Sequence, residues 1–170
     1  MRIPTALAAF VVLACAVLPG VAQRKYFVTV GSENHVKAGT DHEMQIYDLV
    51  NRQRSQQGLN FLFWDENLAA IARRYSRQMA DGEFFGHVDP NGQRIQDRAE
   101  SAGLFNWRKV GENLFQSKNV DDFSLLAVKM WMESPTHREN ILDRSYSSAG
   151  VGVATASDGR VYVTQIYLQK

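Results

Sequence analysis

The sequence predicts an α+β fold in which helices pack against a small antiparallel sheet. Residues 40–58 and 65–82 carry apolar side chains at helical spacing. Near the C-terminus, "AGVGVATA" and "RVYVTQIYL" are rich in β-branched residues and alternate as strands do. The linking "SDGR" holds an Asp-Gly pair, which is typical of a hairpin turn. An extended piece from about residue 108 is expected to add a third strand.

Local signals place the ends of the first two helices. The first is predicted to begin at Thr40, because Thr40 and Glu43 have capping-box spacing, and to stop at Gly58. The second is predicted to begin after Asp65, a favourable N-cap residue, and to end at Gly82.

Three shorter helices are predicted before the hairpin. One carries Ile95 on its apolar side and closes at Gly103, and the next covers about residues 121–133. Because Ser134 is a favoured N-cap and Pro135 a favoured first helical residue, a new helix is expected to begin there.

The N-terminal segment has the features of an export signal. A short charged start, an apolar run and small residues predict that residues 1–22 are a secretory signal peptide. The run falls short of the roughly 20 apolar residues of a membrane span, so no transmembrane segment is predicted. A retained anchor, or a lipoprotein attached through Cys15, is the alternative. Residues 23–39 are predicted to be a flexible lead-in and 40–170 one domain, secreted into the periplasm or outside the cell.

Composition narrows the function classes. Cys15 is the only cysteine, so the mature chain is expected to be free of disulfides and to have no thiol nucleophile. With 19 basic and 18 acidic side chains, the formal net charge is +1. Because the charges balance, the sequence shows no excess of basic residues that would indicate binding to nucleic acid or to an anionic membrane surface. We expect a monomer.

Four ionisable side chains lie at predicted loops or element ends, where sites are usually built. They are His87, Glu112, Glu133 and His137. Two imidazoles and two carboxylates suit a divalent cation of the zinc class, or a general acid and base pair. The helix dipole beside His137 is expected to lower the pKa of that imidazole and keep it neutral. Spacing alone leaves the alternative open that these groups only hydrogen-bond to the backbone.

Other chemistries lack their sequence context. No serine lies in a Gly-x-Ser-x-Gly setting. The two glycines of "GVGV" are interpreted as a strand feature, because the helix and lysine of a phosphate loop do not follow them. Phe84 and Phe85, on a loop beside His87, are candidates for the wall of an apolar cleft.

Five segments, in a fixed order, resemble the CAP superfamily of cysteine-rich secretory proteins, antigen 5 and pathogenesis-related proteins. They are "FFGHVDPNG", "VGENLF", "WMESPTHRENILD", "GVGVA" and "YVTQIY". The bacterial, disulfide-free SCP-like extracellular branch is the most similar, over about residues 43–168. The resemblance implies an α-β-α sandwich with a small antiparallel sheet between helices, and a cleft lined by two histidines and two glutamates.

The motif residues of the family can be matched one by one to positions in this sequence. His87 matches the first histidine of the family, Glu112 the glutamate of its "GEN" motif, and Glu133 the glutamate after its tryptophan helix. Many eukaryotic members take their second histidine from a "HYTQ" strand, but this chain has Tyr162 at that place. It carries His137 in "SPTHR" instead, as bacterial members do, although many of those have asparagine where Glu133 stands.

These residues lead to one expected function and two alternatives. The expected function is a secreted binding module, without catalytic residues, whose cleft holds a divalent cation and accepts a lipid or peptide. Zinc is the expected cation, with magnesium or calcium as alternatives. Side chains expected to line the cleft are Phe85, Asn113, Tyr162 and Gln165. The alternatives are a metal-assisted peptidase-like hydrolase, with Glu112 or Glu133 as general base, and a stable domain whose polar cluster is purely structural.

Overall fold

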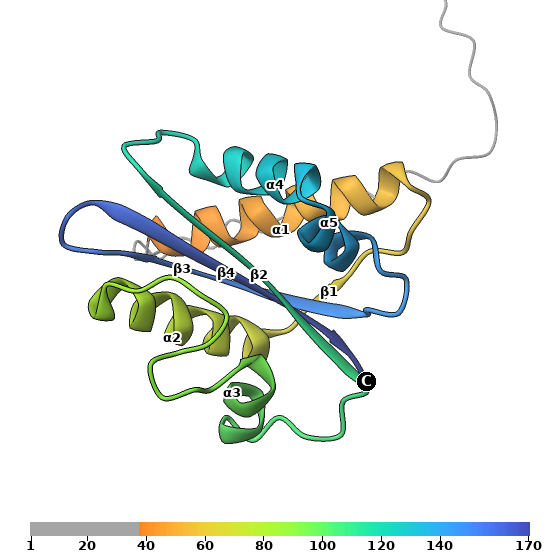
Figure 1. The fold of residues 1–170 in the computed structure, drawn as a ribbon. Coiled ribbons are helices and arrows are strands. Elements are labelled where there is room, and N and C mark those ends of the chain that lie inside the picture. Colours follow the sequence, from red (N-terminus) through yellow and green to blue (C-terminus); the bar gives the residue numbers. More distant parts are fainter. Residues whose placement is uncertain (1–37) are drawn as a thin grey trace, which may run out of the picture. The chain divides into compact units, whose positions relative to one another are not determined.

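A four-stranded sheet lies between two groups of helices in the computed structural model, which describes residues 38–170 (Figure 1). One group is α1 (Ala38–Gln56), α4 (Phe123–Glu133) and α5 (Pro135–Leu142). The other is α2 (Glu66–Gly82) and α3 (Ile95–Ser101). The predicted α+β sandwich is therefore confirmed.

The sheet has the strand order β1-β3-β4-β2. Its strands are β1 (Phe63–Trp64), β2 (Lys109–Lys118), β3 (Ser148–Thr155) and β4 (Arg160–Gln169). β4 pairs antiparallel with both β2 and β3, as the predicted hairpin and third strand require. β1 was not predicted, because two residues are too few to show a strand pattern, and it pairs parallel with β3. The sheet is consequently mixed rather than wholly antiparallel.

The predicted helix boundaries agree with the structure except at the start of α1. That helix begins at Ala38 rather than at Thr40, and its last residue is Gln56. Asp65 caps α2 as predicted, because its carboxylate accepts from the N–H groups of Asn67 and Leu68. The signal peptide and the Cys15 alternative lie outside the described residues, as does the lead-in apart from its last two positions. Within residues 38–170, no helix is long and apolar enough to cross a membrane.

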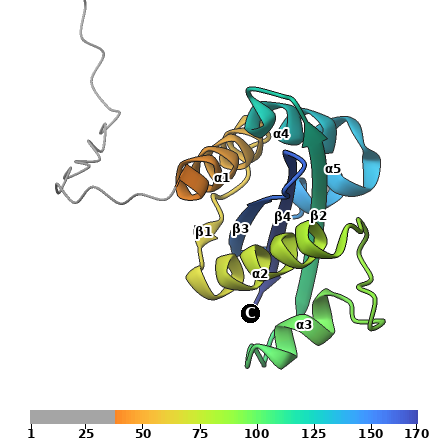
Figure 2. The same ribbon diagram turned by 90° about the vertical axis from the view of Figure 1, so that its left-hand side faces the viewer.

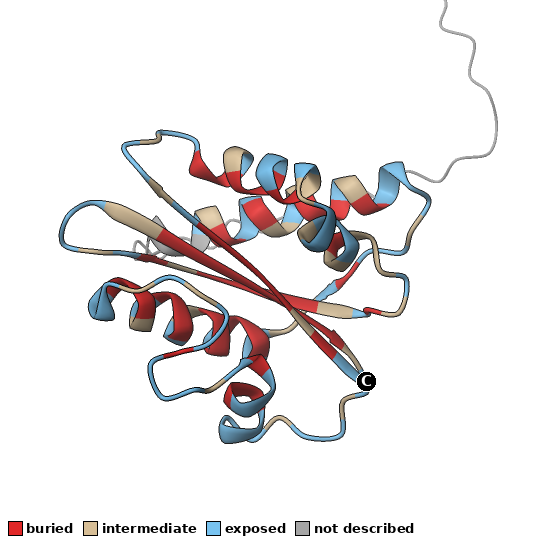
Figure 3. Cartoon of the chain, in the orientation of Figure 1, coloured by how far each residue is buried: buried red, intermediate tan, exposed pale blue. Residues whose placement is uncertain are grey.

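Both faces of the sheet are buried (Figure 3). On the α1, α4 and α5 side the core includes Trp131, Ile141 and Tyr167, each at most 1 % exposed. On the α2 and α3 side, Leu68 and Ile166 belong to a second cluster and are both 0 % exposed. A strand covered on two faces buries nearly every residue, which is why β4 is buried without interruption from Tyr162 to Leu168, polar Thr164 and Gln165 included.

Two glycines of β3 let α2 lie directly on the sheet. A Cβ atom on Gly150 would come within 2.2 Å of the backbone nitrogen of Ala69, and one on Gly152 within 2.0 Å of that of Arg73. Any side chain at either position would push the helix away from the strand. The "GVGV" motif is therefore a packing feature of a strand, as the sequence indicated.

The chain turns sharply between α4 and α5. Ser134 leaves the helical conformation, with φ −91° and ψ 121°, and Pro135 opens the new helix at its first position. Proline is tolerated there because its missing N–H group would have no partner in the first turn. This corner places His137 in the first turn of α5, beside β2.

Candidate functional site

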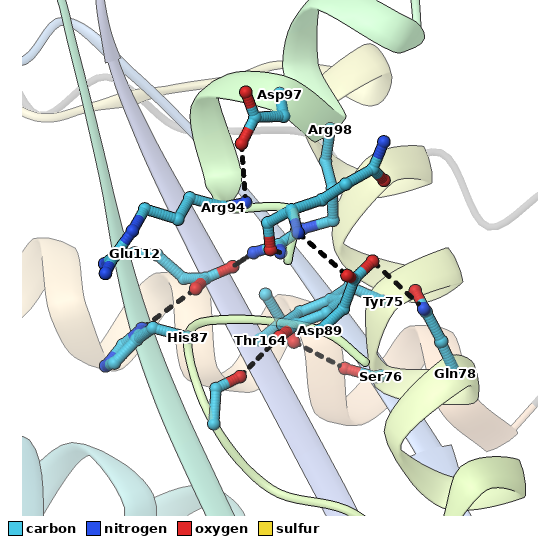
Figure 4. Close-up of polar contacts among 12 residues, drawn as sticks. Tyr75, Ser76, Gln78, His87, Asp89, Arg94, Asp97, Arg98, Glu112 and Thr164 are labelled. Carbon is cyan, nitrogen blue, oxygen red and sulfur yellow. Dashed lines mark hydrogen bonds and ion pairs between the residues drawn. The ribbon is translucent and has the colours of Figure 1, made fainter. Parts of the chain in front are cut away.

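A buried carboxylate on β2 organises the polar centre of the domain (Figure 4). The side chain of Glu112 is only 3 % exposed. Its Oε1 atom lies 2.9 Å from Nδ1 of His87, and its Oε2 atom 2.7 Å from Nη2 of Arg98. A carboxylate that accepts from a guanidinium and an imidazole has partners on both oxygens, which is the condition for burying a charge. We call Arg98, Glu112 and His87 the polar centre.

Arg98 reaches this position from the buried side of α3. Its Nη1 group donates to the backbone oxygen of Gln93 at 2.9 Å, and its guanidinium carbon lies 3.4 Å from the centroid of the Tyr75 ring. The Tyr75 hydroxyl donates to the backbone oxygen of Gly86. Burial raises the pKa of Tyr75 to about 12, although the Arg98 charge opposes the rise, so the hydroxyl stays a donor at neutral pH.

The loop that carries His87 is held by its own turn. Asp89 is buried, and its Oδ1 atom accepts from the N–H groups of Asn91 and Gln93, at 2.8 and 2.9 Å. Gln78 of α2 donates to the other carboxylate oxygen of Asp89 at 3.2 Å. An aspartate that binds the backbone two and four residues ahead fixes a turn. The loop therefore presents His87 in a defined orientation.

The pairing with Glu112 decides which nitrogen of His87 is available. Because the carboxylate can only accept, Nδ1 of His87 is the donor in this contact, and Nε2 is the ring nitrogen left for another partner. The His87 side chain is 49 % exposed, so solvent or a ligand can reach it. This arrangement, a carboxylate behind an imidazole, is the one that orients histidines that bind metal ions.

His137 lies beside His87, although 50 residues separate them in the chain. The centroids of the two rings are 6.3 Å apart, at an interplanar angle of 41°. Asn113 of β2 holds the backbone at this point, because its side-chain amide donates to the His137 carbonyl oxygen at 3.0 Å. Burial lowers the pKa of His137, and the neighbouring His87 lowers it further. The predicted direction is confirmed, but its causes are burial and a second imidazole rather than the helix dipole.

An apolar groove opens next to His137. Its volume is about 310 Å³, and it is lined by Phe85, Leu114, Phe115, Gln116, Met130, Trp131, Ser134 and His137. Two of its apolar side chains are unusually exposed, Phe85 at 44 % and Met130 at 49 %. The volume is at the lower end of the range for ligand pockets, roughly 300–1,000 Å³. We call this feature the groove.

Comparisons with known proteins agree with this architecture. Residues 47–167 match the model of the cysteine-rich secretory protein family, CAP. The chain belongs to the CAP family. Two curated relatives from Bacillus subtilis (strain 168), the uncharacterized membrane protein YlbC and the uncharacterized protein YkwD, are each 34 % identical, over 83 % and 65 % of this chain. The chain spans about two fifths of their lengths, 38 % and 42 %.

A solved structure is similar as well. The SCP domain of an extracellular protein from Bacillus anthracis str. Ames superposes with a TM-score of 0.67 and 30 % sequence identity, covering 78 % of this chain and 41 % of that one. The family, the fold and the bacterial SCP branch predicted from the five sequence segments are thus confirmed.

This CAP domain brings three of the four predicted site residues together, and Glu133 is the exception. Glu133 ends α4 with its side chain 65 % exposed, 4.0 Å from the ammonium group of Lys129. The helix break at Ser134 turns His137 toward the groove and leaves Glu133 on the outer surface of α4. Within residues 38–170, no three histidine, aspartate or glutamate side chains form a metal-binding group. The arrangement differs in this respect from the expected set of four ligands.

Of the four side chains expected to line the cleft, only Phe85 lines the groove. Tyr162 is 2 % exposed and lies behind Phe85, with ring centroids 6.4 Å apart. Asn113 and Gln165 are fully buried and connect through the Tyr167 hydroxyl, which accepts from Asn113 at 3.1 Å and donates to Gln165 at 3.0 Å. These two polar residues belong to the support of the site rather than to its surface.

Sequence reasoning missed Arg98 and Met130. Arg98 lies between Ile95 and Ala99 on the buried side of α3, so a charged residue inside an apolar stripe was the available signal. Met130 gave no signal, because a methionine in an apolar helix is ordinarily core.

Proposed function

We propose that this CAP domain is an extracellular binding module whose groove takes the apolar part of a lipid or peptide. The groove carries this proposal: exposed Phe85 and Met130 face a space that also reaches an imidazole, His137. Large apolar side chains exposed together at a concave site are typical of ligand binding. The N-terminal export features and the extracellular description of the Bacillus anthracis relative support a location outside the cytoplasm.

We further propose that a divalent cation binds between His87 and His137. The donors that fit it are two imidazoles, one oriented by Glu112 and one whose pKa is lowered by burial. Imidazole nitrogens suit zinc, whereas magnesium and calcium take oxygen ligands, so the donor set favours zinc over those alternatives. Two protein ligands leave the remaining positions to water or to the bound molecule, and the ion would polarise an oxygen placed there.

The state of Glu112 favours binding over hydrolysis. A general base needs a carboxylate oxygen free to take a proton from water. Both oxygens of Glu112 already accept strong hydrogen bonds, from His87 and Arg98, and Glu133 lies on the outer surface of α4. Neither Glu112 nor Glu133 therefore suits the general base that the hydrolase alternative needs. The alternative of a purely structural polar cluster gives the exposed groove no role.

Binding of decanoate, a simple apolar anion, tests the proposal by isothermal titration calorimetry. We expect decanoate to bind the protein and to bind more tightly with zinc chloride present, because its carboxylate would meet the cation. Phe85→Ser is expected to weaken binding about tenfold, which is about 1.4 kcal/mol. The matched control is Phe63→Ser, since Phe63 is 74 % exposed on β1 and does not line the groove. Equal losses in the two variants would refute the assignment of the groove.

A further inference from the structure

The groove runs along an open edge of the sheet. β2 is the last strand in the order β1-β3-β4-β2, and Figure 2 shows it at the margin of the sheet. Three consecutive residues of β2, Leu114, Phe115 and Gln116, line the groove. Because successive side chains of a strand point to opposite faces, a groove that touches all three follows the edge rather than a face.

Hydrogen bonds at the ends of the strands show which backbone groups of β2 face this edge. The carbonyl oxygen of Leu168 accepts from Ser147 on the β3 side, whereas that of Gln169 accepts from Arg108 on the β2 side. Odd-numbered residues of β4 therefore bond to β2, and the register pairs them with odd-numbered residues of β2. Since backbone groups alternate in direction along a strand, the N–H and C=O groups of even-numbered β2 residues point outward.

Side chains cover two of these outward groups but stop short of Gln116. Asn140 donates to the carbonyl oxygen of Glu112 at 3.2 Å, and the Trp131 indole donates to that of Leu114 at 2.8 Å. Both bonds confirm the outward direction. Among residues 38–170, the N–H and C=O groups of Gln116 have no such partner, and its side chain is exposed. The edge therefore becomes open at Gln116, which lines the groove together with Met130.

The opposite edge of the sheet, at β3, is covered at two places. There β1 pairs with the first residues of β3, and the carboxylate of Glu43 accepts from the N–H group of Val153 further along, at 3.2 Å. Proteins commonly cover edge strands in this way, because an uncovered edge pairs with other chains. One edge of this sheet is capped and the other ends in an apolar groove.

We propose that the natural ligand of the groove is an extended peptide that adds a strand to β2 at Gln116. This inference rests on the proposed function and specifies its ligand class. A peptide would exchange hydrogen bonds with both backbone groups of Gln116, and the apolar side chain beside its paired residue would contact Phe85 and Met130. A lipid chain lying there would bury the same N–H and C=O groups without partners, which is unfavourable because an unpaired buried backbone group loses its hydrogen bonds to water. The backbone of the edge thus selects a peptide over a lipid.

Proline at position 116 tests the pairing directly. Gln116→Pro removes the outward N–H group, and proline is tolerated on an edge strand because no bond to β4 is lost. Gln116→Ala is the matched control, since it removes the same side chain but keeps the N–H group. The probes are five capped heptapeptides of alternating threonine and serine, identical except for a central Leu, Phe, Val, Ser or Lys.

We expect the peptides with a central Leu or Phe to bind most tightly, with about a tenfold loss in Gln116→Pro and less than about a threefold loss in Gln116→Ala. Equal affinity of both variants would overturn the inference. N-methylation of the peptide bond next to the central residue is a second test on the unaltered protein, which decides the matter if Gln116→Pro does not fold. Undiminished binding of that peptide would also overturn strand addition.

Decanoate separates this inference from the proposed function. If decanoate binds and none of the five peptides does, the peptide inference is wrong and the binding function stands. If neither decanoate nor any peptide binds, the proposed function and the inference both fail.

Discussion

Two neighbouring regions of this CAP domain, the polar centre and the groove, are built in opposite ways. In the polar centre, Glu112 is buried and each of its oxygens has a cationic or imidazole partner. In the groove, Phe85 and Met130 leave nearly half of their surface exposed to water. His87 belongs to the first region and lies against His137 of the second.

This difference separates stability from binding. A buried charge network stabilises only one arrangement, because removing a partner leaves the other charge without compensation. Exposed apolar side chains contribute little to folding, since the folded state does not remove them from water. The polar centre is therefore expected to fix the position of His87, and the groove to provide affinity.

Glu112→Ala is expected to have the largest effect on stability. It leaves the Arg98 guanidinium buried without its carboxylate, and losses of this kind are about 3–5 kcal/mol. The free energy of unfolding, measured by urea denaturation, gives the loss. The matched control is Glu133→Ala, which removes an exposed carboxylate and is expected to change stability by less than about 0.5 kcal/mol. Similar losses in the two variants would contradict the role of the polar centre.

Zinc binding is expected to depend on both regions, because His87 belongs to the polar centre and His137 to the groove. We expect zinc to bind in a titration at neutral pH and to be lost in both His87→Ala and His137→Ala. Glu112→Gln, which keeps the shape but weakens the orientation of His87, should lower the affinity by about 10- to 100-fold. His42→Ala is the control, because His42 lies on α1 and contacts Ser124 instead. Full zinc binding by His137→Ala would exclude a site between the two imidazoles.

Substitution of the groove is expected to spare stability. Met130→Ser removes an apolar side chain that is half exposed, so the unfolding free energy should fall by less than about 1 kcal/mol. Decanoate binding should nevertheless weaken about threefold to tenfold. A loss of stability as large as that of Glu112→Ala would show that the two regions are not separate.

The pKa of His137 predicts a smaller, pH-dependent effect. Burial, and then His87, lower this pKa from its ordinary value of 6.5, so the unfolded chain takes up the proton more readily than the folded one. The contribution of neutral His137 to stability is complete above pH 6.5 and declines as the pH falls through 6.5 toward the lower folded value. Between pH 7.5 and 5, His137→Gln should therefore lose less stability than the unaltered protein does. An identical pH profile would refute the assignment.

The sequence predicted the fold more fully than the site, and the reasons are physical. Helix caps, the Asp-Gly turn and alternating strands are local signals, so the helices and the three long strands were found. Three of the four candidate residues, His87, Glu112 and His137, lie near one another in the structure, and only the family resemblance had indicated this long-range relation. Glu133 is exposed beside Lys129, apart from the other three, because the direction of a side chain at a helix break depends on packing, not on spacing. The open edge at Gln116 was not predicted, because it follows from the order of the strands in the sheet, and a single sequence does not reveal that order.

The most direct test of a groove that binds ligands is an NMR spectrum of protein labelled with ¹³C at the methionine methyl groups, with decanoate added. Met130 lies in the groove, whereas Met44 is similarly exposed, at 41 %, on α1. We expect the Met130 signal to shift in a saturable way while the Met44 signal stays in place. Equal movement of both signals, or a Met130 signal that does not respond to decanoate, would contradict it.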